Sequence, residues 1–277
     1  MSLTLDDVGY EYAAGTAFAE RALDAVSMSV KPGELVLVLG ATGSGKSTLM
    51  RIAAGLLEGF DGRATLDGEP LDRSTARGRV GLVFQDAESS LFAETVAADV
   101  AFGPRNMGSS EVEAAEAAAS ALARVGLPAE EFGDRSPFSL SGGEARRAAI
   151  AGVLAFGPRY LLLDEPTAGL DARGRSAVGT IVSEARAHAG VVVVSHTAEE
   201  FLGAADRVLI LEGGRALYSG PAAQLVADPA PFSAAGLLAP DILRVQLLAR
   251  ERGLKLPSLT LDPIEAAESL ARALGSV

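Results

Sequence analysis

The stretch Gly40-Ala-Thr-Gly-Ser-Gly-Lys-Ser47 decides the fold, because it matches the pattern G-x-x-x-x-G-K-[ST]. It follows Glu34–Leu39, a short and nearly continuous apolar run that is typical of a strand covered on both faces. The glycines let consecutive N–H groups point at phosphate oxygens, and Lys46 adds a positive charge. Ser47 supplies a hydroxyl for Mg²⁺. A flexible turn is the alternative explanation, but a strand before the pattern and a helix after it favour a phosphate-binding P-loop.

Similar apolar runs recur along the chain, with helical stretches between most of them. They are Val80–Phe84, Tyr160–Leu163, Val191–Val194 and Val208–Leu211. This alternation predicts a parallel sheet with crossover helices. Before the P-loop, from Met1 to about Tyr12 and from Leu23 to Val30, apolar and polar residues partly alternate, as in half-buried strands. The predicted fold class is α/β: a P-loop NTPase with a mixed, mainly parallel sheet and N-terminal antiparallel strands.

Two further regions differ from this sheet domain in composition and in expected secondary structure. Residues 86–158 are Ala-rich and helical, with a capping box formed by Ser110 and Glu113, which predicts a helical subdomain inserted into the sheet domain. After residue 228 the strands stop, and two amphipathic helices are expected, Asp241–Arg252 and a second one that begins after Asp262 and ends before Gly275. We therefore predict an ATP-binding domain over 1–228 and a C-terminal helical dimerisation or regulatory segment over 229–277.

Composition excludes several classes of protein. The 277 residues are 48% hydrophobic and 22% charged, which suits one large domain with an appendage and argues against disorder. The absence of cysteine excludes disulfides and thiol chemistry and favours a cytosolic compartment. No signal peptide is visible, and no apolar run approaches the roughly 18 residues of a membrane helix. The formal net charge of −12 argues against nucleic acid as a partner.

Two adjacent carboxylates, Asp164 and Glu165, end the apolar run that begins at Tyr160. Asp164 can hold a Mg²⁺-bound water. Glu165, pointing to the other side, can accept a proton from a water that attacks a γ-phosphate. Solvated acids before a proline turn are the simpler explanation. The P-loop upstream favours the catalytic one.

The segment Leu140-Ser-Gly-Gly-Glu144 opens a predicted helix that runs to about Phe156. Ser141 and Glu144 form a capping-box pattern, so the segment can be explained as a good helix start. Helix starts rarely need two glycines, however, and a Ser-Gly-Gly nest with bare N–H groups suits an anionic ligand. A structural cap and a phosphate contact both remain open from these residues alone.

Two polar residues, Gln85 and His196, come at the ends of other apolar runs. Parallel strands deliver such side chains to the carboxyl edge of the sheet, where open α/β folds bind ligands. A cap or surface role is the alternative for His196, beside which Thr197 and Glu200 are expected to form another capping box. We expect Gln85 and His196 to lie beside the P-loop.

The order of these features resembles the complete ATPase subunit of ATP-binding cassette transporters. That order is the P-loop, Gln85, Leu140–Glu144, Asp164-Glu165, Ala168-Gly-Leu-Asp171 and His196. The resemblance implies that Glu165 is the catalytic base and that His196 contacts the γ-phosphate. It also implies that the Leu140–Glu144 turn reaches the γ-phosphate of the opposite subunit, so that two sandwiched subunits share two ATP sites.

The resemblance also implies individual roles in binding ATP and Mg²⁺. Tyr12 matches the family's adenine-stacking aromatic, and Asp171 matches the loop that crosses the dimer interface. The implied nucleotide-binding residues are Tyr12, Gly40, Ala41, Thr42, Gly43, Ser44, Gly45, Lys46, Ser47, Thr48, Gln85, Ser141, Gly142, Gly143, Glu144 and Asp171. The metal-binding residues are Ser47, Gln85 and Asp164.

A narrower similarity appears in Phe84–Asn106 and Thr167–Asp171, which are similar to the ATPases of energy-coupling factor transporters, the importers of vitamins and of cobalt or nickel ions. This group implies a second ATPase subunit in a homo- or heterodimer, an integral membrane coupling subunit and a substrate-binding membrane subunit, at the cytoplasmic face of the membrane. The sequence does not reveal the cargo, because such a motor contacts membrane subunits and not the transported molecule. Ala87 and Ser90 stand where the group usually has Pro and Gln, and Glu144 replaces the commoner Gln.

Two other functions use the same phosphate-binding P-loop. Cassette ATPases that act on chromosomes, DNA repair or ribosomes need coiled-coil insertions, zinc cysteines or a second cassette, and the sequence has none. A P-loop kinase or GTPase would leave the Ser-Gly-Gly helix start unexplained, and no Asn-Lys-x-Asp motif occurs. The sequence favours the transport motor.

The two C-terminal helices each carry an apolar stripe. The stripe residues are Ile242, Val245 and Leu248 in the first helix, and Ile264, Ala267, Leu270 and Leu274 in the second. Packing on the chain's own core and packing on a second subunit both explain such stripes. We predict a subunit interface.

Overall fold

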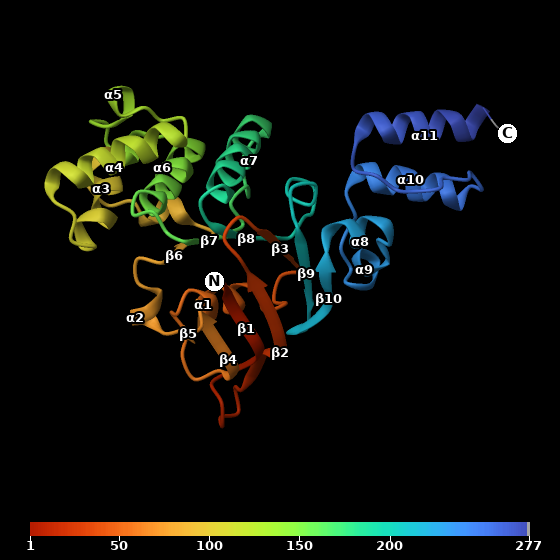
Figure 1. The fold of residues 1–277 in the computed structure, drawn as a ribbon, viewed down its shortest axis with the longest axis horizontal. Coiled ribbons are helices and arrows are strands. Elements are labelled where there is room, and N and C mark those ends of the chain that lie inside the picture. Colours follow the sequence, from red (N-terminus) through yellow and green to blue (C-terminus); the bar gives the residue numbers. More distant parts are fainter. Residues whose placement is uncertain (276–277) are drawn as a thin grey trace.

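The structure is a computed structural model that describes residues 1–275. Two sheets lie at its centre, and two groups of helices lie at opposite ends of its longest axis (Figure 1). One group follows β6 in sequence, and the other forms the C-terminal end of the chain. The predicted fold class is confirmed by the sheets and by the helices that flank them.

The larger sheet has six strands in the order β10-β9-β3-β8-β7-β6. Every neighbouring pair is parallel except β9 with β10, which makes the sheet mixed and mainly parallel. The strands are β3 (Leu35–Leu39), β6 (Val80–Val83), β7 (Tyr160–Asp164), β8 (Gly190–Ser195), β9 (Arg207–Glu212) and β10 (Arg215–Pro221). Parallel pairing brings the carboxyl ends of β3, β6, β7 and β8 to one edge, where the predicted site residues follow them.

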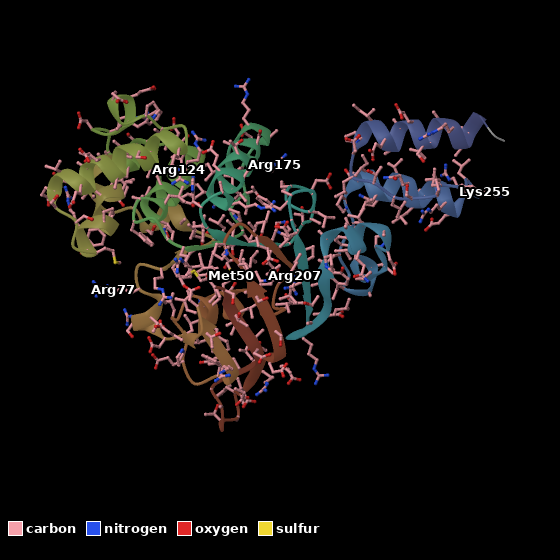
Figure 2. The ribbon with its side chains drawn as sticks, viewed as in Figure 1. Met50, Arg77, Arg124, Arg175, Arg207 and Lys255 are labelled. Carbon is pink, nitrogen blue, oxygen red and sulfur yellow. The ribbon has the colours of Figure 1, made fainter. Side chains whose placement is uncertain are left out.

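The smaller sheet is antiparallel in the order β2-β1-β4-β5. Its strands are β1 (Leu3–Tyr12), β2 (Glu20–Val30), β4 (Asp61–Leu66) and β5 (Glu69–Pro70). Helix α1 (Lys46–Ala53) directly follows the P-loop, and a short α2 (Arg73–Ala76) follows β5. Met50 of α1 is 1% exposed and lies in the core between the two sheets (Figure 2).

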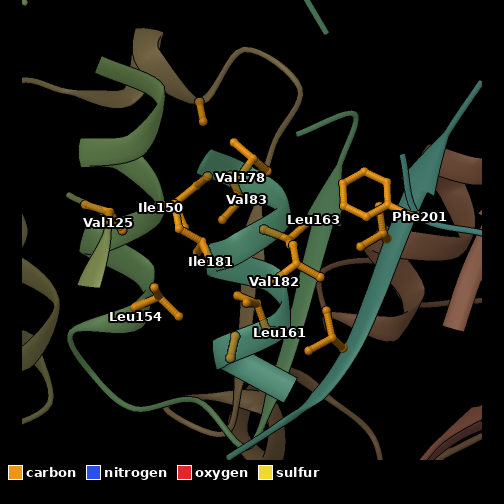
Figure 3. Packing of buried hydrophobic residues seen from close by; sticks show 14 of the residues in the cluster. Val83, Val125, Ile150, Leu154, Leu161, Leu163, Val178, Ile181, Val182 and Phe201 are labelled. Atoms are coloured by element: carbon orange, nitrogen blue, oxygen red, sulfur yellow. The ribbon is translucent and has the colours of Figure 1, made fainter. Parts of the chain in front are cut away.

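The central strands are buried on both faces, as their continuous apolar runs indicate. In β3 the odd-numbered leucines pack into one core cluster with the helices, whereas Val36 and Val38 pack into the other, toward the smaller sheet. Figure 3 shows the first cluster, in which Ile150 of the helical group after β6 and Ile181 of α7 (Ala172–Arg186) point toward one another. Packing in these two cores fixes the positions of the strand ends, where the predicted site residues lie.

Residues 86–158, named here the helical insert, contain six helical elements between β6 and β7. They are η1 (Ala87–Ser90), α3 (Val96–Asn106), α4 (Glu111–Arg124), α5 (Ala129–Phe132), η2 (Pro137–Ser139) and α6 (Gly142–Leu154). The capping boxes at Ser110 and Ser141 are both present, each with its glutamate accepting from the cap backbone. Helix α6 therefore begins at Gly142, immediately after its serine cap.

Residues 222–275 contain four helices, α8 (Ala222–Ala227), α9 (Ala230–Ala234), α10 (Asp241–Glu251) and α11 (Pro263–Gly275). Helix α10 joins the main core through Leu243, which is fully buried, while the predicted stripe residues Val245 and Leu248 are 53% and 51% exposed. In α11, Ile264 and Leu274 are 71% and 62% exposed. Gly275 is the last residue of α11 and does not lie beyond the helix as predicted.

A second prediction is wrong beside His196. Thr197 does not begin a helix, and residues 199–204 form turns. The Thr197 hydroxyl donates to the Glu200 carboxylate at 3.3 Å, but it accepts from the Glu199 N–H and the Thr197 N–H donates to Ser195, so the predicted capping box does not form. None of the helices in residues 1–275 has both the length and the apolarity that crossing a membrane requires.

Candidate active site

A cavity of about 510 Å³ opens at the carboxyl edge of the large sheet and gathers most of the predicted site residues. The P-loop and α1 form one side of it, and the ends of β6, β7 and β8 form the other. Its lining residues are Tyr12, Glu20, Ala22, Thr42, Gly43, Gly45, Lys46, Ser47, Thr48, Gln85, Asp164, Glu165, Ala168 and His196. We name this space the P-loop cavity.

The P-loop presents an uncapped helix start to this cavity. Gly45, the N-cap of α1, has a φ of 101° and makes no side-chain cap hydrogen bond. A Cβ at this position would lie 2.4 Å from the Ala22 carbonyl oxygen, so only glycine fits. Within residues 1–275, the buried Ser44 hydroxyl also has no hydrogen-bond partner. A helix N-terminus with bare N–H groups and a spare hydroxyl fits a bound phosphate.

The ammonium group of Lys46 lies over the same loop. It is mostly buried and donates to the carbonyl oxygens of Gly40, at 2.7 Å, and Ala41, at 2.9 Å. Burial lowers the pKa of Lys46, while the nearby carboxylates of Glu165 and Asp164 act in the opposite direction. These carboxylates favour the charged form that binds an anion.

Ser47 and Asp164 form the place where a cation fits best. The Ser47 hydroxyl donates to the Asp164 carboxylate at 3.2 Å. Burial raises the pKa of Asp164, and the hydrogen bond from Ser47 opposes this effect. In the part of the chain that the structure describes, no three acidic, histidine or cysteine side chains converge on one point. A single carboxylate and a hydroxyl suit Mg²⁺, which takes much of its coordination from water and substrate phosphates.

Glu165 and His196 face one another across the ends of β7 and β8. His196 Nδ1 lies 2.8 Å from Glu165 Oε2, and Glu165 is nearly buried while His196 is 60% exposed. Because an ionised carboxylate only accepts, the shared proton belongs on Nδ1, which leaves Nε2 free toward the solvent side. Glu165 also has a φ of 48°, in the left-handed region that side chains disfavour, so its backbone is held in a strained position.

Tyr12 closes the other end of the cavity. Its hydroxyl lies 3.2 Å from the Thr48 hydroxyl, and its ring meets the ring of Tyr10 edge to face with centroids 4.8 Å apart. An aromatic ring held at its edge and at its hydroxyl keeps one orientation, which suits stacking on a flat ligand.

The remaining predicted residues lie elsewhere. Ser141, Gly142, Gly143 and Asp171 line a second, open cavity of about 890 Å³ between the helical insert and the turn that follows β7. Gln85 and Ala168 line both cavities. Within one chain, the Leu140–Glu144 turn therefore does not line the P-loop cavity.

Glu144 is occupied by its own helix start. Its carboxylate accepts from the Ser141 N–H and hydroxyl, both at 2.8 Å, and the Ser141 hydroxyl accepts from the Glu144 N–H. These hydrogen bonds lower the pKa of Glu144. The capping function that the sequence left open is therefore present, and it turns the carboxylate toward its own backbone.

One buried charged residue near the site was not predicted. Arg146 of α6 is 6% exposed and donates to the backbone carbonyls of Gln85 and Ala168 and to the Glu88 carboxylate. In the sequence it is one of two adjacent arginines on an Ala-rich helix, and no pattern distinguishes it from a solvent-exposed residue. Only the position of α6 against two distant loops identifies it.

Together the P-loop cavity offers a phosphate cradle, a cation site and a carboxylate beside an imidazole. These groups can hold a polyphosphate, polarise its terminal phosphate and accept a proton from an attacking water. This combination is that of a nucleoside triphosphate hydrolase.

The comparisons with known proteins agree with this geometry. The sequence profile of the family described as ABC transporter matches residues 23–168. The energy-coupling factor transporter ATP-binding protein EcfA2 of Symbiobacterium thermophilum is 47% identical over 276 residues, covering 96% of this chain and 95% of that protein. The protein of the same name from Clostridium acetobutylicum is 38% identical, covering 97% of this chain and 96% of that protein.

Solved structures are similar over most of the chain. The structure of cbiO1 from Clostridium perfringens, part of the ABC transporter complex cbiONQ, superposes with a TM-score of 0.74 at 33% identity, covering 88% of this chain and 98% of that chain. An ATP-binding cassette solved as a dimer in a post-hydrolysis state with ADP and Pi gives a TM-score of 0.70 at 28% identity, covering 80% and 99%. This chain belongs to the ABC transporter ATPases and, among them, to the ATP-binding proteins of energy-coupling factor transporters.

Proposed function

We propose that this chain binds Mg²⁺-ATP in the P-loop cavity and hydrolyses it to drive an importer of the energy-coupling factor type. The observation that carries the proposal is the convergence of the P-loop, the Asp164-Glu165 pair and His196 on one cavity. The three features follow the ends of three separate strands, β3, β7 and β8, so their meeting is a property of the folded sheet. The importer's cargo is a vitamin or a cobalt or nickel ion, as the similarity to this group implies.

In this proposal the P-loop holds the β- and γ-phosphates. The uncapped start of α1, with the backbone of residues 40–48, provides N–H donors, and Lys46 adds a full charge. Tyr12 stacks on the adenine ring. Ser47, Gln85 and Asp164 hold the metal, and bound Mg²⁺ would neutralise charge on the phosphates.

Glu165 is the proposed general base and takes a proton from the attacking water. His196, through its contact with Oε2, fixes the carboxylate and keeps Nε2 available for a γ-phosphate oxygen. Lys46 and the helix start stabilise the charge that develops on the phosphate oxygens. The positive φ at Glu165 supports the same role, because a strained backbone at a site holds a side chain in one place.

A second ATPase subunit, identical or homologous, completes each site. The reason is the separation between the two cavities: Ser141, Gly142 and Gly143 bring a helix start to a space that their own P-loop does not share. In a sandwich of two subunits, this turn and Asp171 meet the γ-phosphate held by the other chain. Glu144 stays turned toward Ser141 and away from the phosphate.

The C-terminal segment is proposed to hold the two subunits together when the ATP sandwich is open. The support is the exposure of its apolar stripe residues, above all Val245, Leu248 and Ile264, while neighbouring Leu243 is packed into the core. An exposed stripe beside an anchored face suits a second copy of the same segment.

Membrane subunits are the other proposed partners, and the chain lies at the cytoplasmic face of the membrane. Phe92 and Phe102 of the helical insert are 59% and 47% exposed and pack edge to face with ring centroids 4.9 Å apart. Phe84, beside Gln85, is also half exposed. Exposed aromatic side chains next to the Gln85 loop suit a coupling subunit that must sense the nucleotide.

Purification of the tagged chain from membranes tests this function. The proposal expects an integral coupling subunit and a small substrate-binding membrane protein to accompany it, and expects ATP to drive uptake when the complex is reconstituted in vesicles. Recovery with ribosomes or DNA, and no membrane subunit, would overturn the importer assignment. The identity of the substrate-binding partner also assigns the cargo.

A further inference from the structure

Arg146 is the most buried arginine side chain with a direct connection to the site. It lies on α6, one turn after the Ser141 cap, and is 6% exposed. Its guanidinium contacts two separate segments, the loop after β6 through the Gln85 carbonyl and the Glu88 carboxylate, and the turn after β7 through the Ala168 carbonyl. Burial of a charged guanidinium costs desolvation free energy, and each of these hydrogen bonds offsets part of that cost.

The N–H donors of the Arg146 guanidinium are divided among these acceptors. Nε and Nη2 meet the Glu88 carboxylate at 3.2 and 3.1 Å, and Nη2 also reaches the Gln85 carbonyl at 3.0 Å. Nη1 donates to the Ala168 carbonyl. Only the planar guanidinium offers donors in several fixed directions, so lysine cannot replace this set.

The two carbonyls belong to residues that line the P-loop cavity. Gln85 is a proposed metal ligand. Ala168 lies on the turn after Glu165, and its N–H donates to the Glu165 carbonyl at 3.2 Å. Two hydrogen bonds therefore connect Arg146 of the helical insert, through Ala168, to the backbone of Glu165, the proposed base. That backbone has a positive φ and needs support from its surroundings.

We propose that Arg146 is a positioning residue of the helical insert that fixes the positions of Gln85 and Glu165 relative to one another. It touches neither the nucleotide nor the metal, and it acts by fixing two loops at once. This inference rests on the proposed ATPase function of the P-loop cavity.

The test uses full-length chains with Arg146→Gln, Arg146→Lys and Glu88→Gln, and measures ATP turnover, KM and nucleotide binding. Arg146→Gln should lower kcat about tenfold or more and leave ATP binding within about twofold, because small displacements of reacting groups strongly reduce rate. Arg146→Lys keeps the charge and loses the fork, and it should fall between Arg146→Gln and the wild type. Glu88→Gln keeps both carbonyl bonds and should lose less activity than Arg146→Gln.

The matched control is Arg77→Gln, a substitution of an exposed arginine directly after α2 that lines neither cavity and donates to the Asn106 carbonyl of the helical insert (Figure 2). It should retain the turnover of the wild type. A normal kcat in Arg146→Gln or Arg146→Lys would overturn the proposal, as would a rise in KM at unchanged kcat. If Arg146→Gln does not fold, the kcat of the folded Arg146→Lys decides. A wild-type chain that binds no ATP would instead refute the ATPase function itself.

Discussion

Asp164 and Glu165 are neighbours in sequence, but their surroundings in the folded chain differ. Asp164 receives a hydrogen bond from Ser47, whereas Glu165 contacts His196. Successive residues at the end of a strand point to opposite sides, so one carboxylate faces the P-loop serine and the other faces the neighbouring strand end. This separation suits the two roles that we propose, metal binding for Asp164 and proton transfer for Glu165.

Substitution of Glu165 separates binding from chemistry. Glu165→Gln should retain ATP binding and lose turnover by about 10² or more, the usual scale of a lost general base. Lys46→Ala should lose binding as well, because it removes the charge that lies over the P-loop. Nucleotide binding by fluorescence and phosphate release measure the two effects.

The matched control is Glu116→Gln, a substitution of an exposed carboxylate on α4. It should keep both binding and turnover. Near-normal hydrolysis by Glu165→Gln with nucleotide still bound would place the base elsewhere in the cavity.

At the scale of elements, the turn between β4 and β5 is tied to the start of two strands of the large sheet. The Asp67 carboxylate accepts from Tyr160 at 2.6 Å, from Arg159 at 2.8 Å and from Arg79 at 2.9 Å. Burial alone would raise the pKa of Asp67, but these hydrogen bonds outweigh it and lower the pKa to about 2. The carboxylate joins the two sheets at the end away from the carboxyl edge.

The lowered pKa predicts how stability depends on pH. Because the folded pKa lies below the ordinary value of 3.8, the contribution is present above pH 3.8 and is lost as the pH falls toward 2. Asp67→Asn should therefore lower the free energy of unfolding by on the order of 2 kcal/mol at neutral pH, and the difference from wild type should shrink below pH 3.8.

Chemical unfolding at several pH values measures this difference. Asp134→Asn, a substitution of an exposed carboxylate in the helical insert, is the control and should leave stability unchanged. A constant difference between wild type and Asp67→Asn down to pH 2 would contradict the account.

The elements that sequence patterns predicted are those whose burial the patterns encode. The core strands β3, β7 and β8 are continuous apolar runs and were predicted within about one residue. Strands β4 and β10 were not predicted, because most of their residues face solvent or lie at an edge and show little apolar alternation. The P-loop residues, Asp164, Glu165 and His196 were predicted and converge, whereas Arg146 carries no sequence signal because its partners are 58 to 61 residues or 22 residues away.

At the scale of the whole molecule, the helical insert and the C-terminal segment lie at opposite ends of the long axis with the two sheets between them (Figure 1). In the proposed dimer, the insert presents a helix start to the partner chain, and the C-terminal segment presents its exposed apolar residues. A dimer joined at both places can open at its ATP sites and remain associated.

Charges placed on the stripe test the C-terminal contact. Val245→Glu with Leu248→Glu should fold, because both side chains are half exposed. The dimer that we propose to persist without nucleotide, with a second copy or with a homologous ATPase subunit, should weaken about tenfold or more, because carboxylates would be buried unpaired. Light scattering measures the association.

Lys255→Glu, which adds negative charge to an exposed position of the same segment, is the control and should stay dimeric (Figure 2). A stripe variant that remains as dimeric as the control without nucleotide would place the interface elsewhere.

In the proposed mechanism, ATP is hydrolysed between two subunits, by the P-loop of one and the Ser141 turn of the other. Mixing inactive Lys46→Ala chains with inactive Ser141→Arg chains tests it directly, because a mixed dimer has one site with both defects and one site with neither. This mechanism predicts that ATP turnover returns in the mixture at about half the wild-type rate or less. Mixed dimers that form, as cross-linking would show, and remain inactive would contradict it.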